Sequence, residues 1–280
     1  MGRWIWYTII TLTGLAFAYL VLICPRRIRQ FPEEIRTDYA HRGLHGEGVP
    51  ENSMEAFRRA VEAGYGIELD VQLSRDGEVM VIHDPFLGRM TGCDRMLSEM
   101  TAEELEKLSL QGTDQKIPRF SDVLALVAGR VPLMVELKGE TKNTSLCPKV
   151  MKLLASYQGP YLVESFNPLM VSWFAGHERR IPRGLLYTNV CRELRRTSLF
   201  TVLPTLMILN IVARPQFISY DQKCRRYLTV WLTTHLFRAP RFSWTIHNEE
   251  EYRAACHAGE YAIFEGFLPP ARTGAEGSEP

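Results

Sequence analysis

The residues best suited to chemistry lie in one short stretch, from Ile67 to Asp84 (IELDVQLSRDGEVMVIHD). Glu68 and Asp70 stand two positions apart in an apolar run, so on a strand their carboxylates share one face. A tight Asp-Gly turn and a second apolar run then predict a hairpin that returns His83 towards them. Paired carboxylates can hold a hard cation, and an imidazole can transfer protons. We therefore expect part of an active site here.

Composition limits the classes of protein to consider. The chain has 280 residues, of which 46% are hydrophobic and 23% charged, as expected for a globular protein with one large or two small domains. A net charge of +1 gives no case for a nucleic-acid partner. The six cysteines are scattered and form no Cys-x-x-Cys pair, which argues against a zinc site and against a disulfide framework.

The N-terminus differs in kind from the rest of the chain. Residues 4–24 carry no charge and would span about 30 Å as a helix, at about 1.5 Å per residue. No small-residue cleavage site follows, so we expect an uncleaved single-pass anchor in the cell membrane, with a cleaved signal peptide as the alternative. Arg26, Arg27 and Arg29 follow the run and favour a cytoplasmic location for the remainder.

Strands and helices alternate after a linker at 25–37. The expected strands are 38–40, 67–71, 79–82, 133–137, 161–164, 183–187, 216–219, 242–246 and 262–264. The first expected helix is capped by Asn52 or Ser53 and ends at Gly64. The second helix with a predicted cap spans 121–128, with Ser121 as its N-cap. Further helices are expected at 102–108, 147–156, 168–175 and 225–237. Residues 84–100 read as irregular. This alternation predicts an α/β fold, a (β/α)8 TIM barrel over 38–269 with a small insertion after the second strand. We expect the tail at 270–280 to be disordered.

Polar side chains recur where these strands end, which is where sites of such barrels are built. They are His41, Arg42, Glu68, Asp70, Glu136, Lys138, Ser165 and Trp244. Another unusual run, Leu199 to Ala213, is uncharged but short for a membrane span. It is either a buried barrel helix with a loop, or a patch that enters the membrane surface near the active site.

Several of these residues stand in motifs that occur in a familiar order. The motifs are Ala40-His-Arg-Gly, Pro50-Glu-Asn-Ser, Ile67-Glu-Leu-Asp-Val, His83-Asp84-Pro85 and Glu136-Leu-Lys138. From about Asp38 to Pro269 the chain resembles the glycerophosphodiester phosphodiesterase family, in a membrane-anchored bacterial form. It departs from the family pattern in two places: Phe264-Glu265-Gly266 replaces an ending with aspartate, and Trp244-Thr-Ile-His-Asn replaces Trp-Thr-Val-Asn. These departures leave the substrate preference open.

The resemblance implies a TIM-barrel hydrolase of lipid and glycerol metabolism that uses one divalent cation. The residue roles it implies are Glu68, Asp70 and Glu136 as metal ligands, His41 and His83 as the acid/base pair, and Arg42 and Lys138 as phosphate ligands. Carboxylate oxygens suit Mg²⁺ or Ca²⁺. The sequence leaves open which histidine is the acid, and whether the nucleophile is water or a hydroxyl of the substrate. Trp244 either packs against the substrate's glycerol or belongs to the core.

The expected function is the metal-dependent hydrolysis of glycerophosphodiesters to glycerol 3-phosphate and an alcohol. A lysophospholipase-D-like hydrolysis of membrane lysophospholipids is the alternative with the same chemistry. A catalytically inactive, membrane-bound binding or regulatory barrel is the alternative from another class, and the complete set of site residues argues against it. Glu51 and Asn52 either cap the first helix, bond to the site, or do both. The remaining histidines lack motif partners and read as surface or structural: His45, His177, His235, His247 and His257.

Overall fold

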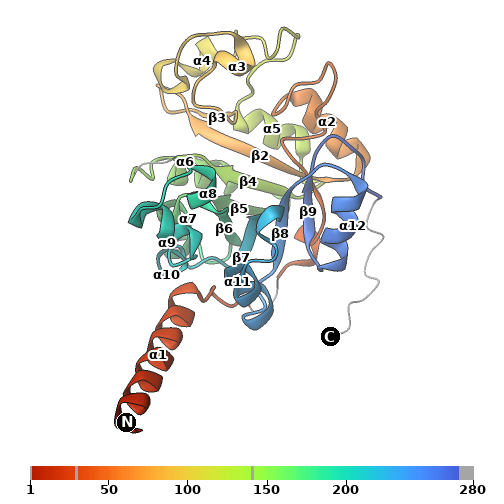
Figure 1. Cartoon of the computed structure of the whole chain (residues 1–280). Coiled ribbons are helices and arrows are strands. Elements are labelled where there is room, and N and C mark those ends of the chain that lie inside the picture. Colours follow the sequence, from red (N-terminus) through yellow and green to blue (C-terminus); the bar gives the residue numbers. More distant parts are fainter. Residues whose placement is uncertain (1, 29–30, 140–141, 271–280) are drawn as a thin grey trace.

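The computed structural model describes residues 2–28, 31–139 and 142–270. Within them, eight parallel strands close into a barrel with helices around it, and one further strand pairs antiparallel at the rim (Figure 1). The strands are β1 (Tyr39–Ala40), β2 (Gly66–Leu73), β3 (Val79–Val81), β4 (Leu133–Leu137), β5 (Tyr161–Ser165), β6 (Arg183–Tyr187), β7 (Phe217–Asp221), β8 (Arg241–Ile246) and β9 (Tyr261–Phe264). The predicted (β/α)8 barrel is therefore confirmed.

The barrel closes through β1, which is only two residues long. Tyr39 lies opposite Gly66 of β2 on one side and opposite Ile263 of β9 on the other, both in parallel register. Tyr39 and Ala40 are fully buried, so this short strand is held by packing as well as by its ladders. Closure makes neighbours of the residues that follow the first and the last strand.

The helices include those expected from the sequence and several that are shorter. They are α1 (Gly2–Ile23), α2 (Met54–Ala63), α3 (Gly88–Thr91), α4 (Ala102–Leu105), α5 (Phe120–Val127), α6 (Leu146–Leu154), α7 (Pro168–His177), α8 (Val190–Glu193), α9 (Leu199–Thr205), α10 (Asn210–Ala213), α11 (Leu228–Trp231) and α12 (Glu249–His257). Of the two predicted caps for α2, Ser53 is the one used: its hydroxyl accepts the Ala56 N–H at 3.2 Å. Gly64 ends the helix at φ 75°.

Some helix predictions are wrong in detail. The helix expected from Ser121 begins at Phe120 with Arg119 as N-cap, because the fully buried Phe120 ring belongs to the core. The helix expected over 225–237 is instead α11 followed by a π-helical turn, Leu232–Leu236. The helix α12 was not predicted, although Asn248 caps it by accepting the Glu251 N–H at 3.0 Å.

The predicted hairpin is present and carries the insertion. The strand β3 returns antiparallel to β2, with Val71 opposite Val81. The chain beyond it is not wholly irregular, since it contains α3, a 3-10 turn at Leu97–Glu99 and α4. These short pieces enclose a small core of their own above the barrel (Figure 1), formed by Met80, Ile82, Leu87, Met90, Leu97, Met100, Ala102, Leu105, Leu110 and Ile117. The insertion after the second strand is therefore confirmed.

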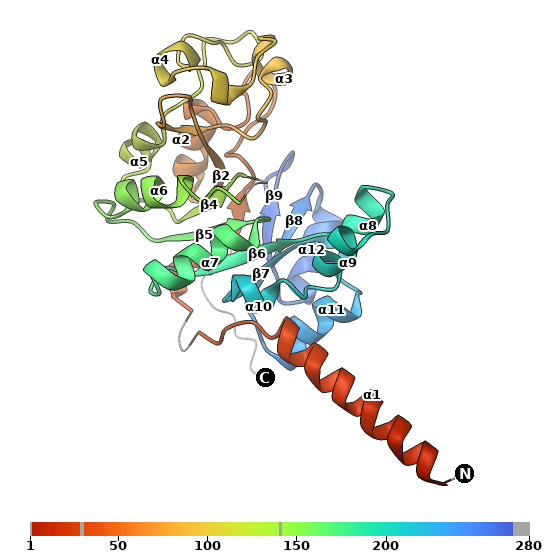
Figure 2. The same ribbon diagram turned by 90° about the vertical axis from the view of Figure 1, so that its left-hand side faces the viewer.

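The long helix α1 is exposed over most of its length but is fixed to the barrel at its C-terminal turn. Ile23 is fully buried in a cluster with Tyr187, and the Asn210 amide donates to the Ile23 carbonyl at 2.8 Å. The Tyr19 hydroxyl donates to the Leu206 carbonyl at 3.2 Å. In Figures 1 and 2, α1 leaves the barrel on the side where α8 and α9 lie.

Residues Arg3–Ile23 are long and apolar enough to cross a membrane, a criterion that N-terminal signal sequences also meet. The linker expected at 25–37 is partly packed, since Phe31 and Ile35 are buried against the barrel. Arg29 lies outside the described residues, as does the predicted tail beyond Pro270.

Candidate active site

Three carboxylates meet at one end of the barrel, on two neighbouring strands. Asp70 of β2 lies in register with Glu136 of β4, and Glu68 shares the inward face of β2 with Asp70. One carboxylate oxygen from each of the three lies within 4.8 Å of the others. All three are nearly inaccessible, with exposed fractions of 2% for Glu68, 1% for Asp70 and 7% for Glu136. The strand register thus creates the cluster expected from the sequence.

The electrostatics of this cluster suit a bound cation. Burial raises the pKa of Glu68 well above its usual range, and the charges of Asp70 and Glu136 raise it further. Burial also raises the pKa of Glu136, to about 7, although Lys138 opposes the shift. Three buried oxygen donors without a cysteine or histidine among them fit a hard divalent cation, which would relieve this repulsion.

Two basic side chains lie directly against the carboxylates. Lys138 Nζ lies 2.7 Å from a Glu136 oxygen and 3.0 Å from Asp70 Oδ1, and Arg42 Nε lies 3.4 Å from Asp70 Oδ2. Burial alone would raise the pKa of Asp70, but Lys138 and Arg42 outweigh it and lower that pKa. Both cations also line the pocket, where they can face a phosphate.

The turn after β1 explains the spacing of the Ala-His-Arg-Gly motif. Arg42 adopts a left-handed φ of 55°, and its backbone N–H donates to a Glu68 oxygen at 3.0 Å. Gly43 follows at φ 80°, where a Cβ would lie 2.9 Å from atoms of Ala56 in α2. Only glycine lets the turn pack this closely against α2. The packing fixes His41 and Arg42 above the carboxylates.

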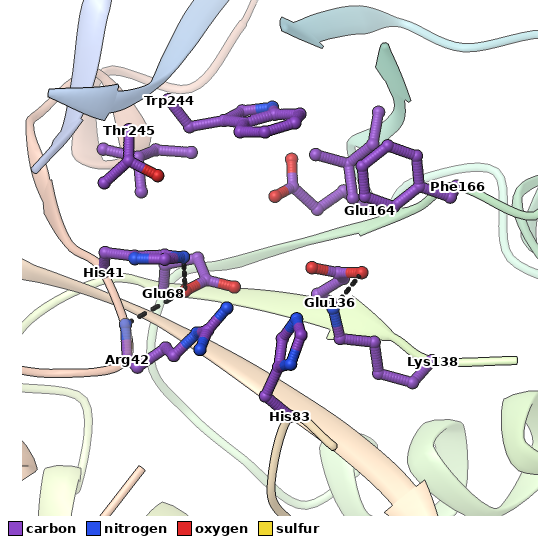
Figure 3. Close-up of a pocket in the computed structure, with 12 residues that line it drawn as sticks. His41, Arg42, Glu68, His83, Glu136, Lys138, Glu164, Phe166, Trp244 and Thr245 are labelled. Atoms are coloured by element: carbon purple, nitrogen blue, oxygen red, sulfur yellow. Dashed lines mark hydrogen bonds and ion pairs between the residues drawn. The ribbon is translucent and has the colours of Figure 1, made fainter. Parts of the chain in front are cut away.

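Each of the two predicted histidines is held through Nδ1 by a carboxylate. His41 Nδ1 lies 2.6 Å from Glu265 Oε2, and His83 Nδ1 lies 2.7 Å from Asp84 Oδ1. Nε2 of His83 is left for the pocket, and Nε2 of His41 lies 3.9 Å from Glu68 Oε2; both side chains line the pocket (Figure 3). Burial lowers the pKa of both imidazoles, against the effect of their carboxylate partners. Each ring is thus oriented for proton transfer at Nε2.

Glu265 is a site residue that the sequence analysis missed. It follows β9, and barrel closure puts it beside His41, which follows β1. Two further histidines surround it: His45 Nε2 lies 3.5 Å from Oε2, and His247 Nδ1 lies 3.3 Å from Oε1. The hydrogen bond with His41 and the nearby His45 imidazole hold the pKa of Glu265 well below its usual range. His45 and His247 stand in no motif, yet the fold places both of them against Glu265.

The Pro-Glu-Asn-Ser motif forms hydrogen bonds with residues of the site. The Asn52 amide donates to Asp70 Oδ2 at 2.8 Å, so Asn52 bonds to the site, while Ser53 caps the helix. Glu51 accepts from Arg42 at 2.8 Å and from Arg89 of the insertion at 2.7 Å. Arg89 also pairs with Asp84, which ties the insertion to the His83 side of the pocket.

The pocket itself has a volume of about 110 Å³ and an aromatic side. Trp244 lies across it from Arg42 and His83 in Figure 3, and its ring meets Phe166 edge-on with centroids 5.7 Å apart. Glu164 of β5, in register with Glu136, also lines the pocket and was not predicted. Ser165 does not line it, because its buried hydroxyl donates to the Leu137 carbonyl at 2.6 Å.

Comparison with known proteins identifies a family whose model matches this chain. Residues 41–211 match the model of the glycerophosphoryl diester phosphodiesterase family. A glycerophosphodiester phosphodiesterase of Caldanaerobacter subterraneus subsp. tengcongensis is 33% identical over 53% of this chain, and the match spans 65% of that relative, slightly less than two thirds. A lysophospholipase D of Rattus norvegicus is 26% identical over 90% of this chain and 91% of its own.

The fold has solved counterparts. An Oleispira antarctica phosphodiesterase, solved in complex with the product sn-glycerol-3-phosphate, superposes with a TM-score of 0.67 at 21% identity. The superposition covers 82% of this chain and 92% of that one. At this identity the likeness shows the shared barrel.

Proposed function

Because this chain belongs to the glycerophosphoryl diester phosphodiesterase family, we propose that it hydrolyses glycerophosphodiesters to glycerol 3-phosphate and an alcohol. One observation carries the proposal. A three-carboxylate cluster, two basic side chains and two oriented histidines meet in one pocket at the end of the barrel. No single member of this set is diagnostic, but the set supplies every group that phosphodiester hydrolysis needs.

The proposed roles follow from the positions of the side chains. Glu68, Asp70 and Glu136 would hold a divalent cation, Mg²⁺ or Ca²⁺, which would supply Lewis-acid chemistry when bound. Arg42 and Lys138, which reach the same carboxylates, bind the phosphate and stabilise the charge that builds on it.

The proton transfers fall to the two histidines. One of His41 and His83 takes a proton at Nε2 from the nucleophile, and the other donates a proton to the departing alcohol oxygen. Glu265 and Asp84 keep Nδ1 of each ring occupied, so the working nitrogen faces the pocket. We propose Trp244 as the contact for the glycerol part of the substrate, since its ring lies across the pocket from Arg42.

The direct test is turnover of glycerophosphocholine by the full chain in lipid nanodiscs. We expect release of choline with Mg²⁺ or Ca²⁺, loss of turnover in EDTA, and recovery when the metal is restored. The full chain is needed because Ile23 and Tyr19 pack on the barrel. Turnover that EDTA leaves unchanged would contradict the metal role. Absence of turnover with either metal would favour the inactive binding or regulatory barrel.

A second candidate is lysophospholipase-D-like hydrolysis, which cleaves the same phosphodiester bond in an acylated substrate. The observation that favours it is the relative named lysophospholipase D, which aligns along 90% of this chain. Lysophosphatidylcholine in the same nanodiscs distinguishes the two candidates. Turnover of this lipid without turnover of glycerophosphocholine would make the second candidate the main function.

We further propose that α1 is an uncleaved membrane anchor and that the barrel lies in the cytoplasm. The buried Ile23 and its contacts with Asn210 support an α1 that stays attached, and Arg26 and Arg27 beside the span support the orientation. The uncharged run Leu199 to Ala213 forms α9 and α10, which pack on the barrel yet leave apolar side chains exposed beside α1. We propose it as a second membrane contact.

Fractionation of cells checks this topology. We expect the intact chain to stay in the membrane after alkaline carbonate washing. A protease added to the outside should leave a C-terminal tag uncut. Recovery of a soluble protein that starts near Cys24 would instead identify residues 4–24 as a signal sequence.

A further inference from the structure

A second pocket lies next to the active site and is about twice as large, at about 220 Å³. Phe166 and Leu186 line both pockets, so the two share a wall. The second pocket extends between β6 and the segment that holds α9 and α10, where Pro204, Met207 and Ile218 line it. Its lining is mostly aliphatic and aromatic, which suits a hydrocarbon better than it suits water.

The polar groups at this pocket are few. The Tyr187 hydroxyl is occupied, since it lies 2.9 Å from the Thr205 carbonyl and 3.1 Å from Thr229 Oγ1. The Asn210 amide donates to the Ile23 carbonyl. The Asn210 Oδ1 and the Thr188 hydroxyl are buried and, among the described residues, have no hydrogen-bond partner. A hydroxyl left in this state costs free energy unless a ligand accepts its proton.

The outer surface of the same segment is apolar as well. Side chains there are widely exposed, with exposed fractions of 67% for Leu199, 86% for Phe200 and 48% for Ile211. Both views show α8 and α9 on the side from which α1 leaves the barrel (Figures 1 and 2). Exposed apolar surface beside a membrane helix favours contact with lipid. The second pocket thus lies between a lipid-facing surface and the active site.

We propose that this second pocket binds the acyl chain of a lysophospholipid whose phosphodiester group sits in the active site. The inference rests on the proposed phosphodiesterase activity and adds a site for the acyl chain of the second candidate's substrate. Phe166 and Leu186 then contact the glycerol end of the chain, and Met207 and Ile218 contact its methylenes. A water-soluble glycerophosphodiester would fill only the first pocket.

The first experiment needs no variant. The full chain in nanodiscs is assayed with glycerophosphocholine and with its 1-butanoyl, 1-hexanoyl and 1-octanoyl esters. Burial of one methylene corresponds to about a fourfold gain in kcat/KM, so each step of two methylenes in this series should give about a 16-fold gain until the pocket is full. If the esters show no gain with chain length while glycerophosphocholine is hydrolysed, the inference fails and the proposed function stands.

The second experiment fills the pocket. Val190→Trp and Leu209→Trp, both at its lining, should lower the kcat/KM of the octanoyl ester relative to that of glycerophosphocholine by about tenfold, since at least two methylenes lose their site. Leu228→Trp is the matched control, because Leu228 is exposed on α11 and does not line the pocket. An equal effect of all three variants on the ratio would overturn the inference.

Binding gives a readout that does not depend on turnover. Titration calorimetry of the octanoyl ester against the His83→Ala variant should show chain-length-dependent affinity, and Val190→Trp in that background should remove the dependence. This result separates the two proposals. If the ester binds in this way but the unchanged chain never hydrolyses it, the acyl site is supported and the proposed phosphodiesterase activity is contradicted. Affinity that does not change with chain length would contradict the acyl site itself.

Discussion

Replacing His83 or His41 with alanine is expected to lower kcat for glycerophosphocholine by about 10²–10⁴-fold, the usual contribution of a positioned acid or base. Each ring lines the pocket, and each is held through Nδ1 by its own carboxylate. The loss should appear in kcat more than in KM, because proton transfer matters in the transition state. His257→Ala, at the exposed end of α12, is the control and should leave kcat unchanged.

The companion variant Glu265→Gln tests the orientation of His41. An amide can still contact Nδ1 but no longer stabilises a charged ring, so we expect a smaller loss in kcat than for His41→Ala. The two losses should not add in the double variant, since both act through one imidazole. Additive losses would contradict the hypothesis that Glu265 acts through His41. A near-normal rate in His41→Ala would remove that histidine from the chemistry.

The second large effect is expected for the carboxylate cluster. Glu68→Gln should remove one ligand and lower turnover by about 10²–10⁴-fold, if the cation contributes several kcal/mol to stabilising the transition state. The same variant should lose the stabilisation that a bound ion gives the folded chain. At 100 times Kd, that stabilisation amounts to about 2.7 kcal/mol.

Thermal unfolding with and without metal measures this second effect. The unchanged chain should gain Tm when Mg²⁺ or Ca²⁺ is added, and Glu68→Gln should gain little. Without metal, the variant should be as stable as the unchanged chain or more stable, because one buried charge near Asp70 and Glu136 is gone. Glu103→Gln, at an exposed position of α4, is the control. A metal-dependent Tm that persists in Glu68→Gln would argue against the assigned ligands.

Much of the site can be read from the sequence because it is built from local rules. Side chains alternate on a strand, so Glu68 and Asp70 had to share a face, and the antiparallel β3 had to return His83 to the same region. Parallel strands of a barrel end on one rim, which brings Glu136 and Lys138 of another strand to the same place.

The site residues that the sequence did not predict depend mainly on contacts between distant parts of the chain. Glu265 becomes a partner of His41 only when β9 closes onto β1, and a motif without aspartate gave no sign of it. Glu164 ends a strand like Glu136 does, so the same rule could have found it. The helix predicted over 225–237 starts only at Leu228, because Tyr227 before it has an extended backbone.

The attachment of α1 to the barrel affects how the active site encounters its substrate. Hydrogen bonds from Asn210 and Tyr19 and the burial of Ile23 hold the C-terminal turn of α1 against the barrel. With α1 in a bilayer, the pocket therefore keeps a constant height and tilt above the lipid. For a lysophospholipid substrate, encounter would then be a search in two dimensions, and the rate would depend on the mole fraction of that lipid in the membrane and not on its bulk concentration. Diluting the substrate with inert lipid would slow such an enzyme, whereas adding buffer would not.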